Sequence, residues 1–310
     1  MKKNNKQVIG GWYKNQLGVC QNTMKKIAAT LMAMSTMVLG CAYNAPPVQA
    51  DEQQQCPRIE IVAARGTSEI GIGPQQYGSA ASNGFEGKVL SRLLHFIEQR
   101  YGPEIFDGVA ITGIDDTVYR AEPIVPDTVG EPGPPNARKE AAWELIQKYG
   151  PIRTIVEPIA RFMRSAFDGA AAVPAAMEMK AQDTGCRAQT IVLGYSQGAI
   201  VLQPYELQLA REGRLVGTLM IGDPQLKTGQ VNFGQPEHNG GLFAGSSSEP
   251  QQLVPRFEYC KRNDFICDTS LDVADGLDVH QSYFDPQMMR DADEEAVAEL
   301  LAQWVREGKR

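Results

Sequence analysis

Hydrophobic and polar positions follow one another along this chain in blocks that predict strands and helices in alternation. Short apolar, β-branched runs predict five strands, at residues 58–64, 109–113, 190–194, 215–222 and 255–259. Apolar positions at helical spacing predict helices over 85–101, 171–183, 199–211 and 294–306. Strands that alternate with helices favour an α/β fold with a doubly wound, mostly parallel five-stranded sheet covered on both faces, a three-layer sandwich.

The segment near 120–168 interrupts this alternation. It opens on a proline- and glycine-rich stretch, 123–135, which cannot form regular structure. Two amphipathic helices are predicted after it, at about 136–149 and 152–167. Their apolar faces allow two interpretations, since they either pack on the core or form a lid or lipid-facing cap over a site. The segment is therefore treated as a helical insert of undecided role.

The first fifty residues differ from the rest and are typical of an export signal. Lys25 and Lys26 supply a basic start, residues 27–40 form an apolar run too short to span a bilayer, and Val48-Gln49-Ala50 is a small-x-small cleavage site. Met24 is an alternative start of the same signal. A lipoprotein anchor at Cys41 is the minor alternative. We expect a signal peptide over 1–50, a flexible tether over 51–55, and a single catalytic domain over 56–310, secreted or associated with the cell envelope.

Charge narrows the choice of partners. The first fifty residues hold six of the 30 lysines and arginines and none of the 37 acidic residues, so the remainder carries a net charge of −13. Such an acidic body argues against a nucleic-acid partner and disfavours electrostatic binding to anionic membranes. It leaves hydrophobic contact with lipid open, so association with an envelope or membrane surface stays possible. A monomer is favoured, although the sequence does not fix the oligomeric state.

Four cysteines follow the predicted signal: Cys56, Cys186, Cys260 and Cys267. An even number in an exported chain predicts two disulfides, and three pairings are possible. The short separation of Cys260 and Cys267 favours a local bridge between them, which leaves Cys56 to pair with Cys186. The spacing within the local pair is poor for zinc.

The main chemical signal is Gly194-Tyr195-Ser196-Gln197-Gly198. It follows an apolar strand and opens an apolar helix, the context of a nucleophile elbow. The two glycines permit a sharp turn that exposes the Ser196 hydroxyl near a helix N-terminus, whose dipole favours developing negative charge. The alternative is an ordinary serine in a strand-to-helix turn.

A nucleophilic serine requires a base, and the chain has three histidines. His95 lies within an amphipathic helix and His238 in an unanchored loop, so His280 is favoured. Its position matches the chain order serine, carboxylate, histidine of α/β-hydrolases. The orienting carboxylate is one of five aspartates: Asp264, Asp268, Asp272, Asp275 and Asp278. Asp264 is preferred because a Cys260–Cys267 bridge would fix its loop.

Four ordered motifs resemble the cutinase family of secreted serine esterases, which has the α/β-hydrolase fold. They are Ala64-Arg65-Gly66-Thr67-Ser68-Glu69, Gly194-Tyr195-Ser196-Gln197-Gly198-Ala199, the Cys260-x-x-x-Asp264-x-x-Cys267 unit and His280-x-x-Tyr283. The resemblance covers about residues 56–285. It implies that Ser196 is the nucleophile, His280 the base and Asp264 its orienting partner. It also implies an oxyanion hole made by the Thr67 hydroxyl and the Gln197 backbone N–H, and the pairing Cys56–Cys186.

The activity implied is hydrolysis of lipid or polyester esters through an acyl-serine intermediate. The long signal, the acidic body and Gly222-Asp223-Pro224 are more similar to actinobacterial cutinase-like proteins, so envelope-lipid esters such as mycolates are expected over plant cutin. An acyltransferase with the same triad and a non-catalytic envelope lipid binder are the alternatives. No cofactor or metal is expected, because phosphate-loop and His-Glu-x-x-His motifs are missing from the sequence, and the Gly71-x-Gly73 stretch has Gln76 where a dinucleotide site needs a third glycine.

Overall fold

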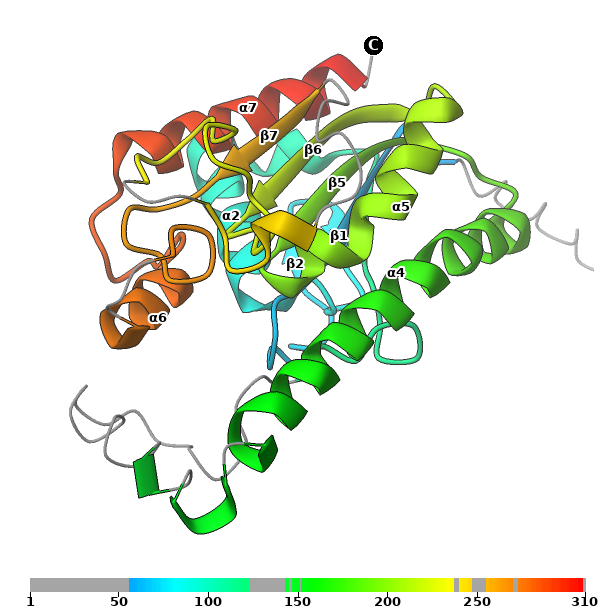
Figure 1. Ribbon diagram of the computed structural model, residues 1–310. Coiled ribbons are helices and arrows are strands. Elements are labelled where there is room, and N and C mark those ends of the chain that lie inside the picture. Colours follow the sequence, from blue (N-terminus) through cyan, green and yellow to red (C-terminus); the bar gives the residue numbers. More distant parts are fainter. Residues whose placement is uncertain are drawn as a thin grey trace, which may run out of the picture. The chain divides into compact units, whose positions relative to one another are not determined.

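A parallel sheet of five strands forms the centre of the computed structural model (Figure 1), which describes residues 56–122, 143–144, 147–150, 152–236, 240–246, 255–269 and 273–308. The strands are β1 (Ile59–Ala64), β4 (Val109–Gly113), β5 (Gln189–Tyr195), β6 (Leu215–Ile221) and β7 (Arg256–Tyr259). Their order is β4-β1-β5-β6-β7, and all four pairings are parallel. The predicted fold class is confirmed.

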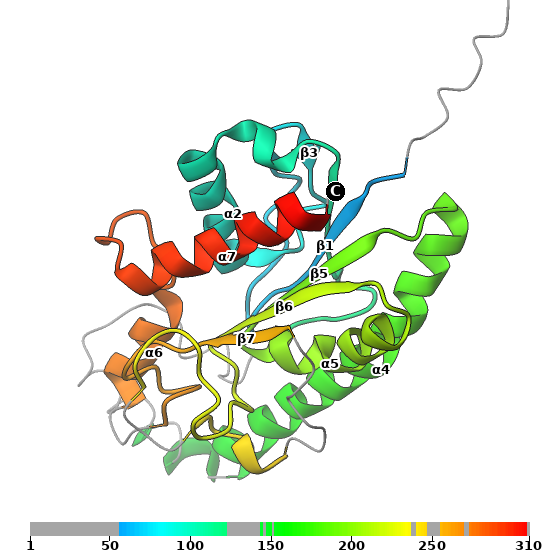
Figure 2. The same ribbon diagram turned by 90° about the horizontal axis from the view of Figure 1, so that it is seen from above.

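Each face of the sheet is covered by a separate layer of helices (Figure 2). Alternate strand residues such as Ile61 and Leu193 join the core under α2 (Gly87–Tyr101) and α7 (Ala292–Gly308). Their neighbours Val62 and Val192 point the other way, to the core under α4 (Glu157–Thr184) and α5 (Gln197–Arg211). Strand residues are therefore buried on both faces, which explains the continuous apolar runs in the sequence.

The strand order places a topological switch point between β1 and β5. From β1 the chain crosses to β4 on one side, and it then returns past β1 to build β5, β6 and β7 on the other. In open α/β sheets, ligands bind beyond the carboxyl ends of the strands at such a point. The loop after β1 carries Thr67, and the turn after β5 carries Ser196, so both predicted residues lie at this position.

The helical insert differs from the prediction. The structure has one long helix, α4, where two were expected at 152–167 and 171–183, and a π-helical turn, η3 (Ile152–Val156), precedes it. Gly169 does not interrupt α4, because a β-carbon there would lie 3.0 Å from the Tyr119 ring, so the glycine permits close packing. Residues 143–144 and 147–150 are helical, in agreement with the earlier helix, whereas 123–142 lie outside the described residues.

Several smaller elements were not predicted. A two-stranded antiparallel hairpin, β2 (Gln76–Tyr77) and β3 (Ala80–Ala81), lies between β1 and α2, where the sequence analysis predicted no element. Helix α6 (Val273–Gln281) carries His280, and short helices η1 (Pro103–Phe106) and η4 (Ala244–Ser246) complete the elements. Each is too short to give a periodic signal of its own.

Residues Gln55–Arg310 cluster as one compact unit. The predicted signal peptide and nearly all of the tether lie outside the described residues. Within the described part of the chain, no helix has the length and hydropathy needed to cross a membrane. The same part contains no group of three or more histidine, cysteine or acidic side chains able to hold a metal ion.

Candidate active site

Ser196 lies on a strained turn between β5 and α5. Its φ of 53° and ψ of −123° are conformations that a residue with a side chain rarely adopts, at a cost of about 1–3 kcal/mol. Its backbone N–H donates to the Ile221 carbonyl at 2.9 Å, which fixes the turn to β6. A β-carbon on Gly198 would lie 2.0 Å from the Ala64 carbonyl oxygen, so the last glycine of the motif is required for α5 to approach β1.

His280 is held from both sides at the same edge of the sheet. Its Nδ1 lies 2.9 and 2.8 Å from the two carboxylate oxygens of Asp264. With the proton on Nδ1 donated to this carboxylate, Nε2 is left as the acceptor that a serine hydroxyl needs. The Tyr195 ring stacks on the imidazole with centroids 4.9 Å apart, and the Tyr195 hydroxyl donates to the His280 carbonyl at 2.8 Å.

These contacts place the turn that carries Ser196 against His280. Tyr195, which precedes the serine, stacks on the imidazole. Gly222 follows Ile221, whose carbonyl accepts the Ser196 N–H. A β-carbon on Gly222 would lie 2.7 Å from the His280 Cε1 and 3.3 Å from an Asp264 carboxylate oxygen. The segments that carry the three predicted triad residues therefore lie together around the carboxyl ends of β5 and β6.

Asp264 is fully buried, and its carboxylate accepts two hydrogen bonds besides that of His280. The Tyr283 hydroxyl donates to Asp264 Oδ2 at 2.6 Å, and the Ile266 backbone N–H donates to Oδ1 at 2.8 Å. Tyr283 in turn accepts a bond from the Lys261 N–H at 2.9 Å. Burial and the charge of Asp264 raise the pKa of Tyr283, so its hydroxyl stays a donor. The carboxylate thus has a fixed orientation toward the imidazole.

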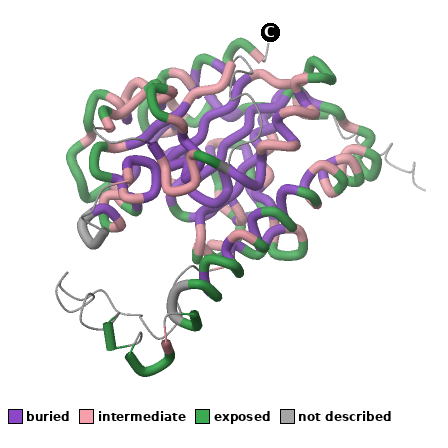
Figure 3. The backbone as a smooth tube through the Cα atoms, viewed as in Figure 1, coloured by how far each residue is buried: buried purple, intermediate pink, exposed green. Residues whose placement is uncertain are grey.

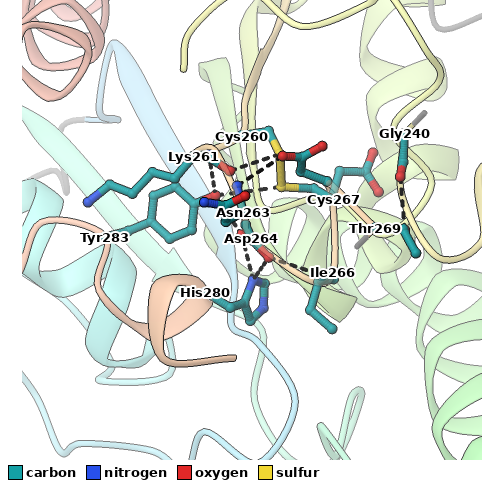
Figure 4. The surroundings of a disulfide bond; sticks show 12 residues. Gly240, Cys260, Lys261, Asn263, Asp264, Ile266, Cys267, Thr269, His280 and Tyr283 are labelled. Atoms are coloured by element: carbon teal, nitrogen blue, oxygen red, sulfur yellow. Dashed lines mark hydrogen bonds and ion pairs between the residues drawn. A yellow bond between two sulfur atoms is a disulfide. The ribbon is translucent and has the colours of Figure 1, made fainter. Parts of the chain in front are cut away.

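The Cys260–Cys267 disulfide closes the loop that carries Asp264 (Figure 4). The figure shows Asp264 between this bond and the His280 ring. A second disulfide joins Cys56 to Cys186, 130 residues later in the sequence, and links the chain before β1 to the chain before β5. Both expected pairs are present in the structure.

The loop after β1 runs directly against Ser196. A β-carbon on Gly66 would lie 3.2 Å from the Ser196 Cβ. The next residue is Thr67, whose hydroxyl oxygen is buried and has no hydrogen-bond partner among the described residues. A buried unpaired hydroxyl costs free energy, and this one lies in the loop that contacts Ser196.

Two charged side chains hold this loop, the buried Arg65 and the partly buried Glu69. The Arg65 guanidinium donates to the carbonyls of Glu69, Ile114 and Tyr119 and pairs with Asp116. The Glu69 carboxylate accepts the backbone N–H groups of Gly66 at 2.8 Å and Val89 at 3.0 Å. Burial raises the pKa of Glu69, while these backbone bonds and the charge of His280 oppose the rise.

Gln197 begins α5, so its backbone N–H is among the first amides of the helix, which lack an acceptor inside it. Its side chain is buried and fully engaged. Oε1 accepts the Tyr119 hydroxyl at 2.7 Å, and Nε2 donates to the Phe162 carbonyl of α4 at 2.7 Å. The Gln197 backbone N–H therefore has no acceptor within α5, while the Gln197 side chain joins α4 to the turn at Ser196 by a hydrogen bond.

The alternative histidines and aspartates considered in the sequence analysis have other surroundings or lie outside the described residues. His95 contacts Glu98 of its own helix α2 and the Tyr77 ring of β2, a structural role. Asp268 accepts the Asn263 N–H at 2.9 Å, and Asp278 is exposed on α6. His238, Asp272 and the Asp275 side chain lie outside the described residues.

The sequence analysis quoted Tyr195, Glu69, Gly222 and Tyr283 within motifs but assigned them no supporting role. These roles are defined by contacts between segments far apart in the sequence.

Comparison with known proteins agrees with the resemblance read from the sequence. Residues 160–298 match the family model "Cutinase". The match includes the motifs that carry Ser196, Asp264 and His280, whereas the Ala64–Glu69 motif lies before the matched residues. No curated protein sequence matches the chain.

Solved structures with similar folds include a cutinase-like protein from Cryptococcus sp., with 17% identity and a TM-score of 0.46 over 82% of this chain and 96% of that one. The catalytic core of acetyl xylan esterase from Trichoderma reesei has 16% identity and a TM-score of 0.45 over 82% and 100%. Lysin B from Mycobacteriophage D29 has 16% identity and a TM-score of 0.36 over 81% and 84%.

Proposed function

We propose that this protein is a secreted serine esterase of the cutinase type that hydrolyses esters of lipids or polyesters through an acyl-serine intermediate. In this proposal Ser196 is the nucleophile, His280 the general base and Asp264 the residue that orients the imidazole. The observation that supports it most is the Asp264–His280 pair beside a serine on a strained elbow. Nucleophile, base and orienting carboxylate in this order form the arrangement used for acyl transfer.

The first half of the reaction transfers the acyl group to the enzyme. The Ser196 Oγ attacks the ester carbonyl carbon, and its proton passes to His280 Nε2. The carbonyl oxygen becomes an oxyanion, for which the Thr67 hydroxyl and the Gln197 backbone N–H are the proposed donors. When the tetrahedral intermediate collapses, the bond to the alcohol oxygen breaks and His280 returns the proton to this leaving group.

The second half releases the acid. Water attacks the acyl-serine carbonyl carbon and gives its proton to His280. The carbonyl oxygen again becomes an oxyanion and accepts hydrogen bonds from the same two donors. Collapse then frees the carboxylic acid and restores Ser196. Asp264 stays ionised throughout and stabilises the imidazolium that forms twice in each cycle. The cycle requires no cofactor.

The two disulfides support export, since such bonds form and persist in oxidising compartments. We propose that the 1–50 leader directs secretion and that the substrate is a lipid ester, with envelope lipids such as mycolates as the first candidates. The support for a lipid substrate is the series of exposed apolar side chains on η3 and α4.

Hydrolysis of p-nitrophenyl esters from butyrate to palmitate by the purified protein tests this function. Wild type and a Ser79→Ala control on the β2–β3 turn should be active, and Ser196→Ala should lose activity while its circular dichroism spectrum is unchanged. Activity that rises toward palmitate favours a lipid substrate. Wild-type turnover by Ser196→Ala would contradict the proposal.

A further inference from the structure

A line of apolar side chains runs along one face of η3 and the first turns of α4. Its members recur at intervals of three and four residues, the spacing that places side chains on one helix face. They are Ile152, Val156, Ile159, Met163 and Phe167, and we call this set the α4 stripe. Four of them are exposed: Ile152 by 67%, Val156 by 55%, Ile159 by 38% and Phe167 by 52%.

The α4 stripe is distinct from the face that α4 buries. Phe162 and Ala166 are buried against Ile200 of α5, and Val173 and Met177 continue this contact into the core. Figure 3 shows exposed residues prevailing in the N-terminal part of α4 and burial increasing toward the sheet. The helix thus uses one side to pack against the domain and presents a second apolar side to solvent.

The stripe adjoins the candidate active site. The Phe162 carbonyl accepts the side-chain N–H of Gln197, the residue after the proposed nucleophile, at 2.7 Å. The Phe162 ring stacks on Phe243 with centroids 5.6 Å apart, and Met163 packs against the same cluster. A surface that covered the stripe would therefore lie next to the helix that starts at the elbow.

Charges along this segment are favourable for an anionic surface. Three exposed arginines, Arg153, Arg161 and Arg164, stand among the stripe residues against two exposed carboxylates, Glu157 and Asp168. This gives a positive segment in a body with a net charge of −13. Exposed apolar side chains flanked by arginines are typical of helices that lie in a membrane interface. The preceding helical residues include Trp143 and Tyr149, exposed by 59% and 47%, and both types favour such interfaces.

We propose that the α4 stripe docks on the surface of a lipid aggregate that carries anionic headgroups, so that Ser196 works at that surface on esters held in it. The role in catalysis rests on the proposed function, whereas the docking itself does not. The apolar side chains would enter the acyl region and the arginines would meet the headgroups, with the buried face of α4 still holding the helix to Gln197.

Co-sedimentation with vesicles tests docking without any turnover. The Ser196→Ala protein is mixed with vesicles of phosphatidylcholine alone or with phosphatidylglycerol added. It should bind the anionic vesicles, and the added triple change Ile152→Ser, Val156→Ser, Phe167→Ser should weaken binding about tenfold or more. The matched control is Met179→Ser, because Met179 is 59% exposed on the same helix but lies away from the stripe. This control should bind within about twofold of the parent.

A second variant, Arg153→Glu with Arg164→Glu, should remove the preference for anionic vesicles while leaving the apolar stripe intact. Binding that is equal for the parent and the triple variant, or binding to neither vesicle, would overturn the proposal. A concentration-dependent dimer that the triple change dissolves would overturn it as well, since a second copy would then be the occupant. Hydrolysis of a soluble butyrate ester, measured separately on the wild-type protein, reports on the esterase function alone.

Discussion

The hydroxyl of Thr67 allows a test in which catalysis and stability change in opposite directions. The change is Thr67→Val, which replaces the hydroxyl by a methyl group of similar size. In the resting structure this hydroxyl is buried with no partner among the described residues, and its loop lies against Ser196. If the hydroxyl serves the oxyanion, its loss affects the transition state, whereas the resting protein loses only an unsatisfied polar group.

Both magnitudes follow from these two roles. Loss of one oxyanion donor costs about 2.7–4 kcal/mol of transition-state stabilisation, so kcat should fall about 100- to 1,000-fold. A buried unpaired polar group costs about 1–3 kcal/mol, so the free energy of unfolding should rise by about 1 kcal/mol when the hydroxyl is removed. Thr67→Ser, which keeps the hydroxyl, should retain kcat within about tenfold of wild type.

The assay pairs kcat on p-nitrophenyl butyrate with urea unfolding of the same preparations. Wild-type kcat in Thr67→Val would refute the oxyanion role of the hydroxyl. A lower free energy of unfolding in Thr67→Val would instead refute the reasoning that the hydroxyl is unsatisfied at rest.

Three further predictions concern groups that support the site. Glu69→Ala should lower the free energy of unfolding by about 3 kcal/mol in urea titrations, because two backbone N–H groups lose their acceptor, and Glu69→Gln should lose less; equal losses would contradict this. The double change Cys260→Ser, Cys267→Ser should lower the free energy of unfolding by about 2.5 kcal/mol. It should also lower kcat, because the loop that carries Asp264 is no longer closed by a disulfide. An unchanged kcat would show that the disulfide does not orient the Asp264 carboxylate. Burial raises the pKa of Glu258 to about 8. Because this folded-state pKa exceeds the ordinary value of 4.5, the stability that the protonated carboxyl contributes is lost as the pH rises from about 4.5 to about 8, so Tm should fall over that range and level off above it. Glu258→Gln should flatten that slope, and an unchanged slope would place its origin in another group.

The sheet and its helices were predictable because their signals are local and periodic. The five strands are short apolar runs between helices of 3.6-residue period, and the observed bounds differ from those expected by a few residues. The elbow was predictable for the same reason, since Gly194 to Gly198 stand where a strand ends and a helix begins. Gly198 then proved to be required by its contact with the Ala64 carbonyl.

The continuity of α4 was not predictable from the sequence. Asp168 and Gly169 look like a helix end, and only the packing of Tyr119 against Gly169 accounts for a glycine in the middle of a helix. Tertiary contacts outweigh a glycine's low helix propensity of about 1 kcal/mol. His280 lies near the end of the short helix α6, an element that the sequence analysis did not predict.

The support of the site depends on contacts across the fold. The Tyr195 hydroxyl reaches the His280 carbonyl 85 residues later, and Arg65 reaches residues about fifty positions away. No spacing within the sequence encodes such pairs. By contrast, the Cys260–Cys267 bridge joins residues seven positions apart and was readily inferred.

The most direct test of the central claim is covalent labelling of the nucleophile. A fluorophosphonate probe is added to the purified wild-type protein, the protein is digested, and the labelled peptide is identified by mass spectrometry. The account predicts a single adduct on Ser196, with labelling lost in Ser196→Ala, strongly slowed in His280→Ala and retained in Ser79→Ala. An adduct on another residue, or an unlabelled wild-type protein that is fully folded, would contradict it.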